Sequence, residues 1–238
     1  MGDNTFNKKR TVYLVLLTVL TVLVFDQWLK IYIKTNMTLG QSVTIFSDWF
    51  ELHFTENPGM AFGLTLGGKW GKIVLTLFRI LASGLIVYYI SSLIKEKAKT
   101  GLIVLVGLIL AGALGNIIDS LFYGIVFSAS SYHEVASAFP NDGGYAPIFM
   151  GKVVDMLYFP LIDSIWPTWV PFIGGERFQF FRPVFNIADA AISIGVFSII
   201  VFRNTLFQTD LNSELDKSST DSLNKIEAEI TQTAPKDL

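Results

Sequence analysis

Cysteine is absent from the 238-residue chain, and histidine occurs only twice, as His53 and His133. The sequence therefore offers no disulfide, no thiolate nucleophile and no zinc site built from Cys or His. Charge is also scarce, because 16% of the residues are charged against about 25% in an ordinary soluble domain. The 18 basic and 20 acidic residues nearly balance, so no basic surface for nucleic acid is indicated. We expect no metal, no other cofactor and no nucleic-acid partner.

Apolar residues make up 51% of the chain and gather in four stretches that approach the roughly 20 residues needed to cross a bilayer. The sequence therefore predicts an α-helical integral membrane protein. The four expected transmembrane helices cover residues 11–29, 73–94, 101–118 and 184–202. A cleaved signal peptide is the alternative for the first stretch, but no small-residue cleavage site follows it.

The distribution of basic residues predicts the orientation of these helices. Lys and Arg cluster at residues 8–10 and again at residues 95–99, which by the positive-inside rule places both of these ends in the cytoplasm. With four spans both termini are cytoplasmic, and segments 34–72 and 120–183 lie outside. Residues 1–203 then form one four-helix membrane domain. Residues 204–238 are polar and acidic and are predicted to be a disordered cytoplasmic tail.

The two outer segments carry different patterns. Apolar and polar residues alternate in residues 42–46 and 50–55, which predicts a small extracytoplasmic β-sheet. The segment 120–183 is rich in aromatic residues and proline, and it is predicted to lie at the membrane interface, where aromatic rings are favoured.

Four ionisable residues interrupt the spans, and in this topology all of them lie toward the outer face: Asp26, Arg79, Asp119 and Asp189. Ionisable groups at membrane depth are costly unless they are paired or hydrated, so they suggest a functional site. The alternative for each one taken alone is an interfacial residue that meets lipid headgroups.

Two of these acids belong to a repeated Asn-x-x-Asp pattern, Asn116 with Asp119 and Asn186 with Asp189. This spacing places both side chains on one helical face and predicts a polar pocket between the third and fourth helices. Hydrogen bonds that merely hold the helices together are an equally good interpretation.

Two further features lie in the outer segments. Asp155 stands in the apolar run 153–156, although an acid in a loop is more often a surface charge, as we interpret Asp142 and Asp163. The run 57–63 pairs a turn signal with small residues, so it either binds an extended peptide or forms only a hairpin turn.

Five motifs occur along residues 11–203 in a fixed order. They are Phe25-Asp26-Gln27 with Lys30, Glu56-Asn57-x-Gly59-x-Ala61-Phe62-Gly63, Gly115-Asn116-x-x-Asp119, Val153-Val154-Asp155, and Phe185-Asn186-x-Ala188-Asp189-x-x-Ile192. Together they resemble the motifs of the lipoprotein signal peptidases, also called signal peptidase II. The chain departs from the family pattern at Ser120, where Arg is usual, and in the length of the segment between Asp119 and Asp189.

The resemblance implies roles for individual residues. Asp155 and Asp189 correspond to the catalytic aspartate pair. The expected polar contacts of the site are Asn57, Asn116 and Asn186, and the expected supporting residues are Asp26, Lys30, Gly59 and Asp119. Two carboxyls held close together cannot both ionise cheaply, so such a pair can supply a base and an acid without a metal.

The resemblance also implies a function in the bacterial inner membrane. The expected activity is removal of signal peptides from prolipoproteins that carry diacylglycerol on a cysteine, with cleavage just before that cysteine at the outer membrane face. Expected partners are this substrate and membrane lipid, and the chain is expected to be a monomer. The alternative is a small ion or proton transporter that relays ions through the intramembrane carboxylates. The uncharged inner halves of the helices disfavour it.

Overall fold

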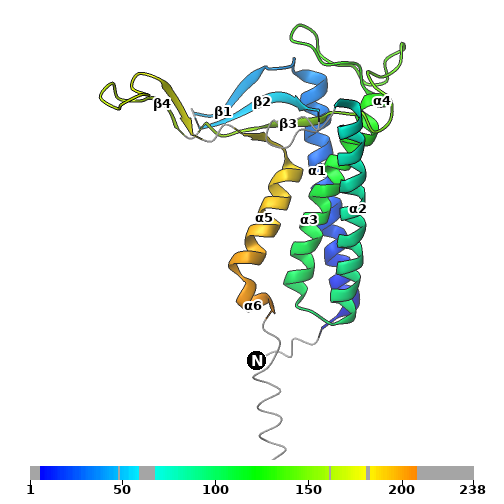
Figure 1. Ribbon diagram of the computed structural model, residues 1–238. Coiled ribbons are helices and arrows are strands. Elements are labelled where there is room, and N and C mark those ends of the chain that lie inside the picture. Colours follow the sequence, from blue (N-terminus) through cyan, green and yellow to red (C-terminus); the bar gives the residue numbers. More distant parts are fainter. Residues whose placement is uncertain (1–5, 48, 59–67, 161, 181–182, 208–238) are drawn as a thin grey trace, which may run out of the picture.

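The computed structural model describes residues 6–47, 49–58, 68–160, 162–180 and 183–207 (Figure 1). Its helical elements are α1 (Lys8–Asn36), α2 (Gly68–Lys95), α3 (Thr100–Ile118), the π-helical turn η1 (Asp119–Tyr123), α4 (Gly124–Val126), α5 (Ile187–Val201) and α6 (Arg203–Phe207). Three of the described helical stretches are long and apolar enough to cross a membrane: Lys8–Asn36, Trp70–Lys95 and Thr100–Val126. The apolar α5 is shorter, with 15 residues.

The helices differ from the predicted spans at their outer ends. Helix α1 continues to Asn36 and α2 already begins at Gly68, so the segment between them is shorter than predicted. The prediction that the last helix begins at residue 184 is wrong. Val184–Phe185 forms strand β6, which pairs with β3, and Asn186 caps the helix that follows.

A four-stranded antiparallel sheet joins β1 (Ser42–Phe46), β2 (Phe50–Asn57), β3 (Val153–Tyr158) and β6 (Val184–Phe185) in that order. The first two strands confirm the sheet predicted from the alternating pattern. Strand β3 was not predicted, although it carries Asp155, which pairs with Thr55 of β2. A separate hairpin is formed by β4 (Ile162–Ile165) and β5 (Arg177–Phe180).

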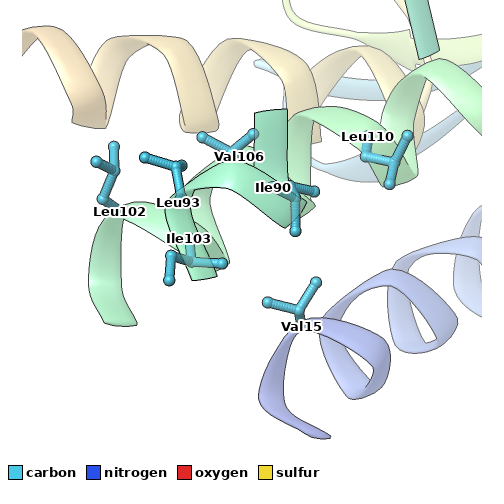
Figure 2. Close-up of a cluster of buried hydrophobic side chains, with 7 residues drawn as sticks. All are labelled: Val15, Ile90, Leu93, Leu102, Ile103, Val106 and Leu110. Carbon is cyan, nitrogen blue, oxygen red and sulfur yellow. The ribbon is translucent and has the colours of Figure 1, made fainter. Parts of the chain in front are cut away.

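Helix α3 is the centre of the bundle and packs against α1, α2 and α5. Figure 2 shows the apolar core where α1, α2 and α3 meet, formed by Val15, Ile90, Leu93, Leu102, Ile103, Val106 and Leu110. Contact between α3 and α5 is especially close at Gly112, where a Cβ atom would lie 2.2 Å from the carbonyl oxygen of Ala188. Glycine is therefore required at this crossing.

The sheet lies across one end of the helices, and α6 lies at the opposite end (Figure 1). A second apolar core fills the junction between the sheet and the helices, and it consists of Ile33, Met37, Phe54, Tyr123, Phe127, Val154 and Met156. The sheet thus covers the same end of the bundle at which the intramembrane charges were predicted to meet.

Candidate active site

A buried ion cluster of Asp26, Lys30 and Asp119 ties α1 to the end of α3. The Nζ of Lys30 lies 2.9 Å from Oδ2 of Asp26, one helical turn away, and 2.9 Å from Oδ2 of Asp119. All three side chains are buried, with exposed fractions of 1% or less. Gln27 donates hydrogen bonds to both carboxylates. Buried charges persist only when they are paired and hydrogen bonded in this way.

Each carboxylate of the ion cluster also accepts a hydrogen bond from the backbone of a distant element. Asp26 Oδ1 accepts from the backbone N–H of Ala188, 2.9 Å away, and Asp119 Oδ2 accepts from that of Val154 at 3.2 Å. These two residues directly precede Asp189 and Asp155. The ion cluster therefore fixes the backbone beside both of the acids that the resemblance identifies as catalytic.

Asn116 connects the ion cluster to Asp189. Its Oδ1 accepts a hydrogen bond of 3.0 Å from Lys30 Nζ, and its Nδ2 donates one of 2.8 Å to Asp189 Oδ1. Asn116 is buried, whereas Asp189 is partly exposed at the start of α5. The amide thus holds one oxygen of Asp189, while the other oxygen accepts a longer hydrogen bond of 3.4 Å from the backbone N–H of Asn186.

Asn186 connects Asp189 to Asp155. As the N-cap of α5 it accepts a hydrogen bond from the backbone N–H of Asp189 and forms a capping box with it. Its Nδ2 donates to Asp155 Oδ1 at 2.6 Å and to Asn116 Oδ1 at 3.1 Å. The second Asn-x-x-Asp pattern is therefore a helix cap and a link between the two acids at the same time.

Asp155 is buried on β3, between the buried apolar residues Val154 and Met156 of the same strand. Burial, and after it the negative charge of Asp189, raises its pKa from the ordinary 3.8 to about 7. Asp155 therefore keeps its proton up to near-neutral pH. The two acids influence each other electrostatically, as expected of a pair of carboxyls that share one site.

A second ion group, which the sequence analysis missed, surrounds the buried carboxylate of Glu56 of β2. Lys34 of α1 and Lys152 pair with its carboxylate, the latter at 2.9 Å, and Ser130 donates a hydrogen bond to it. Burial alone would raise the pKa of Glu56, but the two lysines outweigh this effect and lower it. The sequence feature that could have indicated this group is Lys34, which lies one helical turn beyond Lys30 and so on the same side of α1.

Arg79 of α2 is half-buried and lies next to η1, where its Nη1 is 3.5 Å from Oγ of Ser120. The carboxylates that act on it electrostatically are those of Asp189, Asp119 and Asp155, in decreasing order. The structure thus brings Arg79 to the same region as Asp155 and two of the predicted intramembrane acids, Asp119 and Asp189. It also places a guanidinium beside Ser120, where the resemblance leads one to expect an Arg.

The remaining predicted residues lie at the edge of this region. Asn57 ends β2, next to Glu56. Gly59 and the rest of the run to residue 63 lie outside the described residues. Asp142 is exposed, as predicted for a surface charge, and His53 shares a hydrogen bond of 2.7 Å with Ser42. Within the described residues, no three His, Asp or Glu side chains are grouped so that they could hold a metal ion.

Comparison with known proteins gives a consistent result. The family described as signal peptidase (SPase) II matches residues 18–205. The lipoprotein signal peptidase of Porphyromonas gingivalis is 49% identical over 184 residues, which cover 77% of this chain and 79% of that protein. The lipoprotein signal peptidase of Amoebophilus asiaticus is 39% identical over 207 residues, or 85% and 83% of the two chains.

Solved structures share the fold. Two that are described as bacterial membrane enzymes align with a TM-score of 0.51 each and with 22% and 24% identity. The alignments cover 82% of this chain and 92% and 94% of the solved chains.

Proposed function

Because the chain belongs to the signal peptidase II family of membrane peptidases, we propose that it cleaves prolipoproteins by an aspartic mechanism, with Asp155 and Asp189 as the catalytic pair. The observation that carries this proposal is the pair of amide bridges at the site. Asn116 holds Asp189, and Asn186 holds Asp155 and caps the helix that begins at Asp189. Two acids from distant parts of the chain are thereby kept in one place.

The mechanism follows from the protonation of the pair. Asp155, whose pKa is raised to about 7, is the protonated partner and donates a hydrogen bond to the carbonyl oxygen of the scissile peptide. Asp189 takes a proton from a water molecule, which attacks the carbonyl carbon. The proton of Asp155 then passes to the leaving amine as the tetrahedral intermediate breaks down. No covalent intermediate with the protein forms.

The supporting residues act on the positions of the two acids. Asn57, Asn116 and Asn186 provide polar contacts, and Asp26, Lys30, Gly59 and Asp119 support the site. The ion cluster contributes through the backbone of Ala188 and Val154, the residues before the two acids. A buried, fully paired cluster is rigid, which suits residues that have to hold a catalytic geometry.

We further propose that residues 1–203 form a four-span membrane domain with α5 as the last span, that residues 204–238 form a cytoplasmic tail, and that the chain is a monomer. The site then lies at the outer membrane face, beneath the sheet. A signal helix can lie against the bundle while the diacylglyceryl chains of the substrate cysteine stay in the bilayer. We propose that cleavage occurs just before that cysteine.

The transporter alternative has less support. A relay through the membrane needs polar or ionisable groups along its whole path. In the part of the chain that the structure describes, the buried ion pairs lie at the end of the bundle that the sheet covers. The opposite half of α3 packs with apolar residues of α1 and α2.

The direct test is incubation of the purified protein in detergent with a prolipoprotein that carries diacylglycerol on its cysteine. We expect a shorter product on a gel, and we expect mass spectrometry to place its new N-terminus at the modified cysteine. The same precursor without the lipid is the matched control and is expected to stay intact. Cleavage at another bond, or equal cleavage of the unmodified precursor, would contradict the proposed substrate.

The proposed topology makes a labelling prediction. A single cysteine at Ser42 or Ser137, both exposed in the outer segments, is expected to react in intact cells with a thiol reagent that cannot cross the membrane. A cysteine at Ser218 in the tail is expected to react only after the cells are opened. The cysteine-free wild type is the control for background labelling. Labelling in the reverse pattern would place the site on the cytoplasmic face.

The mechanism also predicts how activity depends on pH. As the pH rises past about 7, Asp155 loses its proton, and the rate is expected to fall. As the pH falls, the pair takes up a second proton and no base remains, so the rate falls again. A rate profile over pH checks this bell shape, whose two limbs belong to the pair and not to single residues. A rate that stays constant across the acidic and neutral range, or that a chelator lowers, would argue against the aspartate pair.

A further inference from the structure

Arg79 is an unusual residue for its surroundings. It lies in the apolar, membrane-spanning part of α2. Its neighbours in sequence are large apolar residues on the exposed surface of the bundle: Leu77, Phe78, Ile80 and Leu81. Arg79 itself is half-buried and reaches inward to Ser120 of η1. The only cation in the middle of this helix therefore faces the interior of the protein.

The guanidinium of Arg79 is poorly satisfied where it lies. Among the described residues it forms no ion pair with a carboxylate. Its one direct polar contact with another described residue is a 3.5 Å interaction with the hydroxyl of Ser120, at the long limit for a hydrogen bond. An arginine has five N–H donors, so most of its donors remain available. A charged group without a partner at membrane depth lowers the stability of the folded protein, so such a residue indicates a functional site.

Two other polar residues follow the same face of α2. Thr76, one turn before Arg79, is buried, and its hydroxyl donates to the backbone carbonyl oxygen of Lys72 in the same helix. Ser83, one turn beyond, is buried, and its hydroxyl has no hydrogen-bond partner in the described part of the chain. The spacing of three and four residues aligns these side chains on one side of the helix. Among the described residues, this side of α2 therefore carries two side chains with unused donors, Arg79 and Ser83.

We propose that Arg79 is a substrate-binding residue, whose guanidinium donates hydrogen bonds to carbonyl oxygens of the substrate next to the scissile bond. This inference rests on the proposed function and extends it to a specific contact. The substrate has two kinds of carbonyl oxygen that can accept these hydrogen bonds. One is in the peptide backbone, where the chain is extended for cleavage, and the other is in the ester groups of the attached lipid. The planar guanidinium can bind two of these oxygens at once.

The position of Arg79 separates this role from catalysis. Asp155 and Asp189 act on it only through longer-range electrostatics, and neither is bonded to it. It therefore does not hold either acid in place. Its effect falls on how tightly the substrate is bound and positioned, whereas proton transfer stays with the pair.

The experiment measures kcat and KM of Arg79→Gln and Arg79→Lys with the lipid-modified prolipoprotein. Loss of charged hydrogen bonds in Arg79→Gln is expected to raise KM by about 10- to 100-fold, with a much smaller change in kcat. Arg79→Lys keeps the positive charge but loses the planar guanidinium that can bind two oxygens. Its KM is expected to lie between those of the wild type and Arg79→Gln. Lys95→Gln, at the other end of α2, is the matched control and is expected to leave both constants unchanged. Thermal unfolding is expected to stay near the wild-type midpoint, because only one weak contact is lost.

A substrate analogue with ether-linked chains identifies the carbonyl that is bound. If the ester carbonyls are the acceptors, Arg79→Gln has little further effect on this analogue; if peptide carbonyls are the acceptors, its full effect remains. Three results would overturn the inference. They are an unchanged KM in Arg79→Gln, a decrease in kcat alone, and a loss of activity that a lower unfolding midpoint explains. Failure of the wild type to cleave the lipid-modified substrate would instead overturn the proposed function.

Discussion

Asp155→Asn and Asp189→Asn are each expected to lower the rate of cleavage by at least about 100-fold, the lower bound for loss of a positioned acid or base. Asparagine has the shape of aspartate but can neither accept a proton from water nor give one to the leaving amine. It keeps one oxygen that can accept the existing amide hydrogen bonds from Asn186 and Asn116. The variants are therefore expected to fold, and gel assays of the purified proteins measure the loss.

The double variant and an unrelated acid provide the controls. Because the two carboxyls act as one unit, the double variant is expected to be no slower than either single variant. Asp142→Asn changes an exposed acid of the same outer segment and is expected to retain full activity. Substantial turnover by either single variant, with wild-type thermal stability, would show that the pair has been misassigned.

Lys30→Met is expected to have the largest effect on stability. The change removes the only cation from the ion cluster and leaves the buried carboxylates of Asp26 and Asp119 facing each other. Removing one partner of a buried ion pair typically costs about 3–5 kcal/mol. The backbone of Val154 and Ala188 depends on the same carboxylates, so activity is expected to be lost as well. Thermal unfolding in detergent and the cleavage assay measure the two effects.

A second substitution tests whether buried charge is the cause. In Lys30→Met with Asp26→Asn, one of the two uncompensated carboxylates is neutral, so part of the lost stability is expected to return. Lys9→Met, which changes an exposed lysine of the same helix, is expected to leave the unfolding midpoint unchanged. A Lys30→Met variant with wild-type stability, or a double variant less stable than the single one, would be inconsistent with this account.

The parts of the fold that were predicted from the sequence are those with a local pattern. The alternation of apolar and polar residues predicted strands β1 and β2, and the long apolar runs predicted the helices. Strand β3 has no alternation of apolar and polar residues, because residues 153–156 are all buried. Asp155 is the only polar residue among these four, with two apolar residues before it and one after it. A strand covered on both sides looks like any short apolar run, and its partners β2 and β6 are distant in sequence.

In the candidate site, too, only the features with a local sequence pattern could be predicted. The Asn-x-x-Asp spacing correctly suggested that Asn116 and Asp189 lie near each other, and the structure joins them by a hydrogen bond. The spacing could not show that Asp119 bonds to the backbone of Val154 and not to the neighbouring helix α5. Backbone N–H groups are the same in every residue, so a contact of this kind has no signature in the sequence. The roles of Asp155 and Asp189 came from the resemblance alone, and the substitutions above test them.

The proposed catalytic pair is divided between two layers of the molecule. Asp155 belongs to the sheet that covers the bundle, and Asp189 to the first turn of a helix below it. The depth of the helices is set by the thickness of the hydrocarbon core, whereas a sheet at the membrane surface follows the headgroups. A bilayer that is too thick or too thin is therefore expected to pull the two acids in different directions, against the ion cluster, the two asparagine bridges and the apolar core between sheet and helices. If the proposed site is correct, we expect the rate of cleavage to depend on the thickness of the bilayer that surrounds the protein.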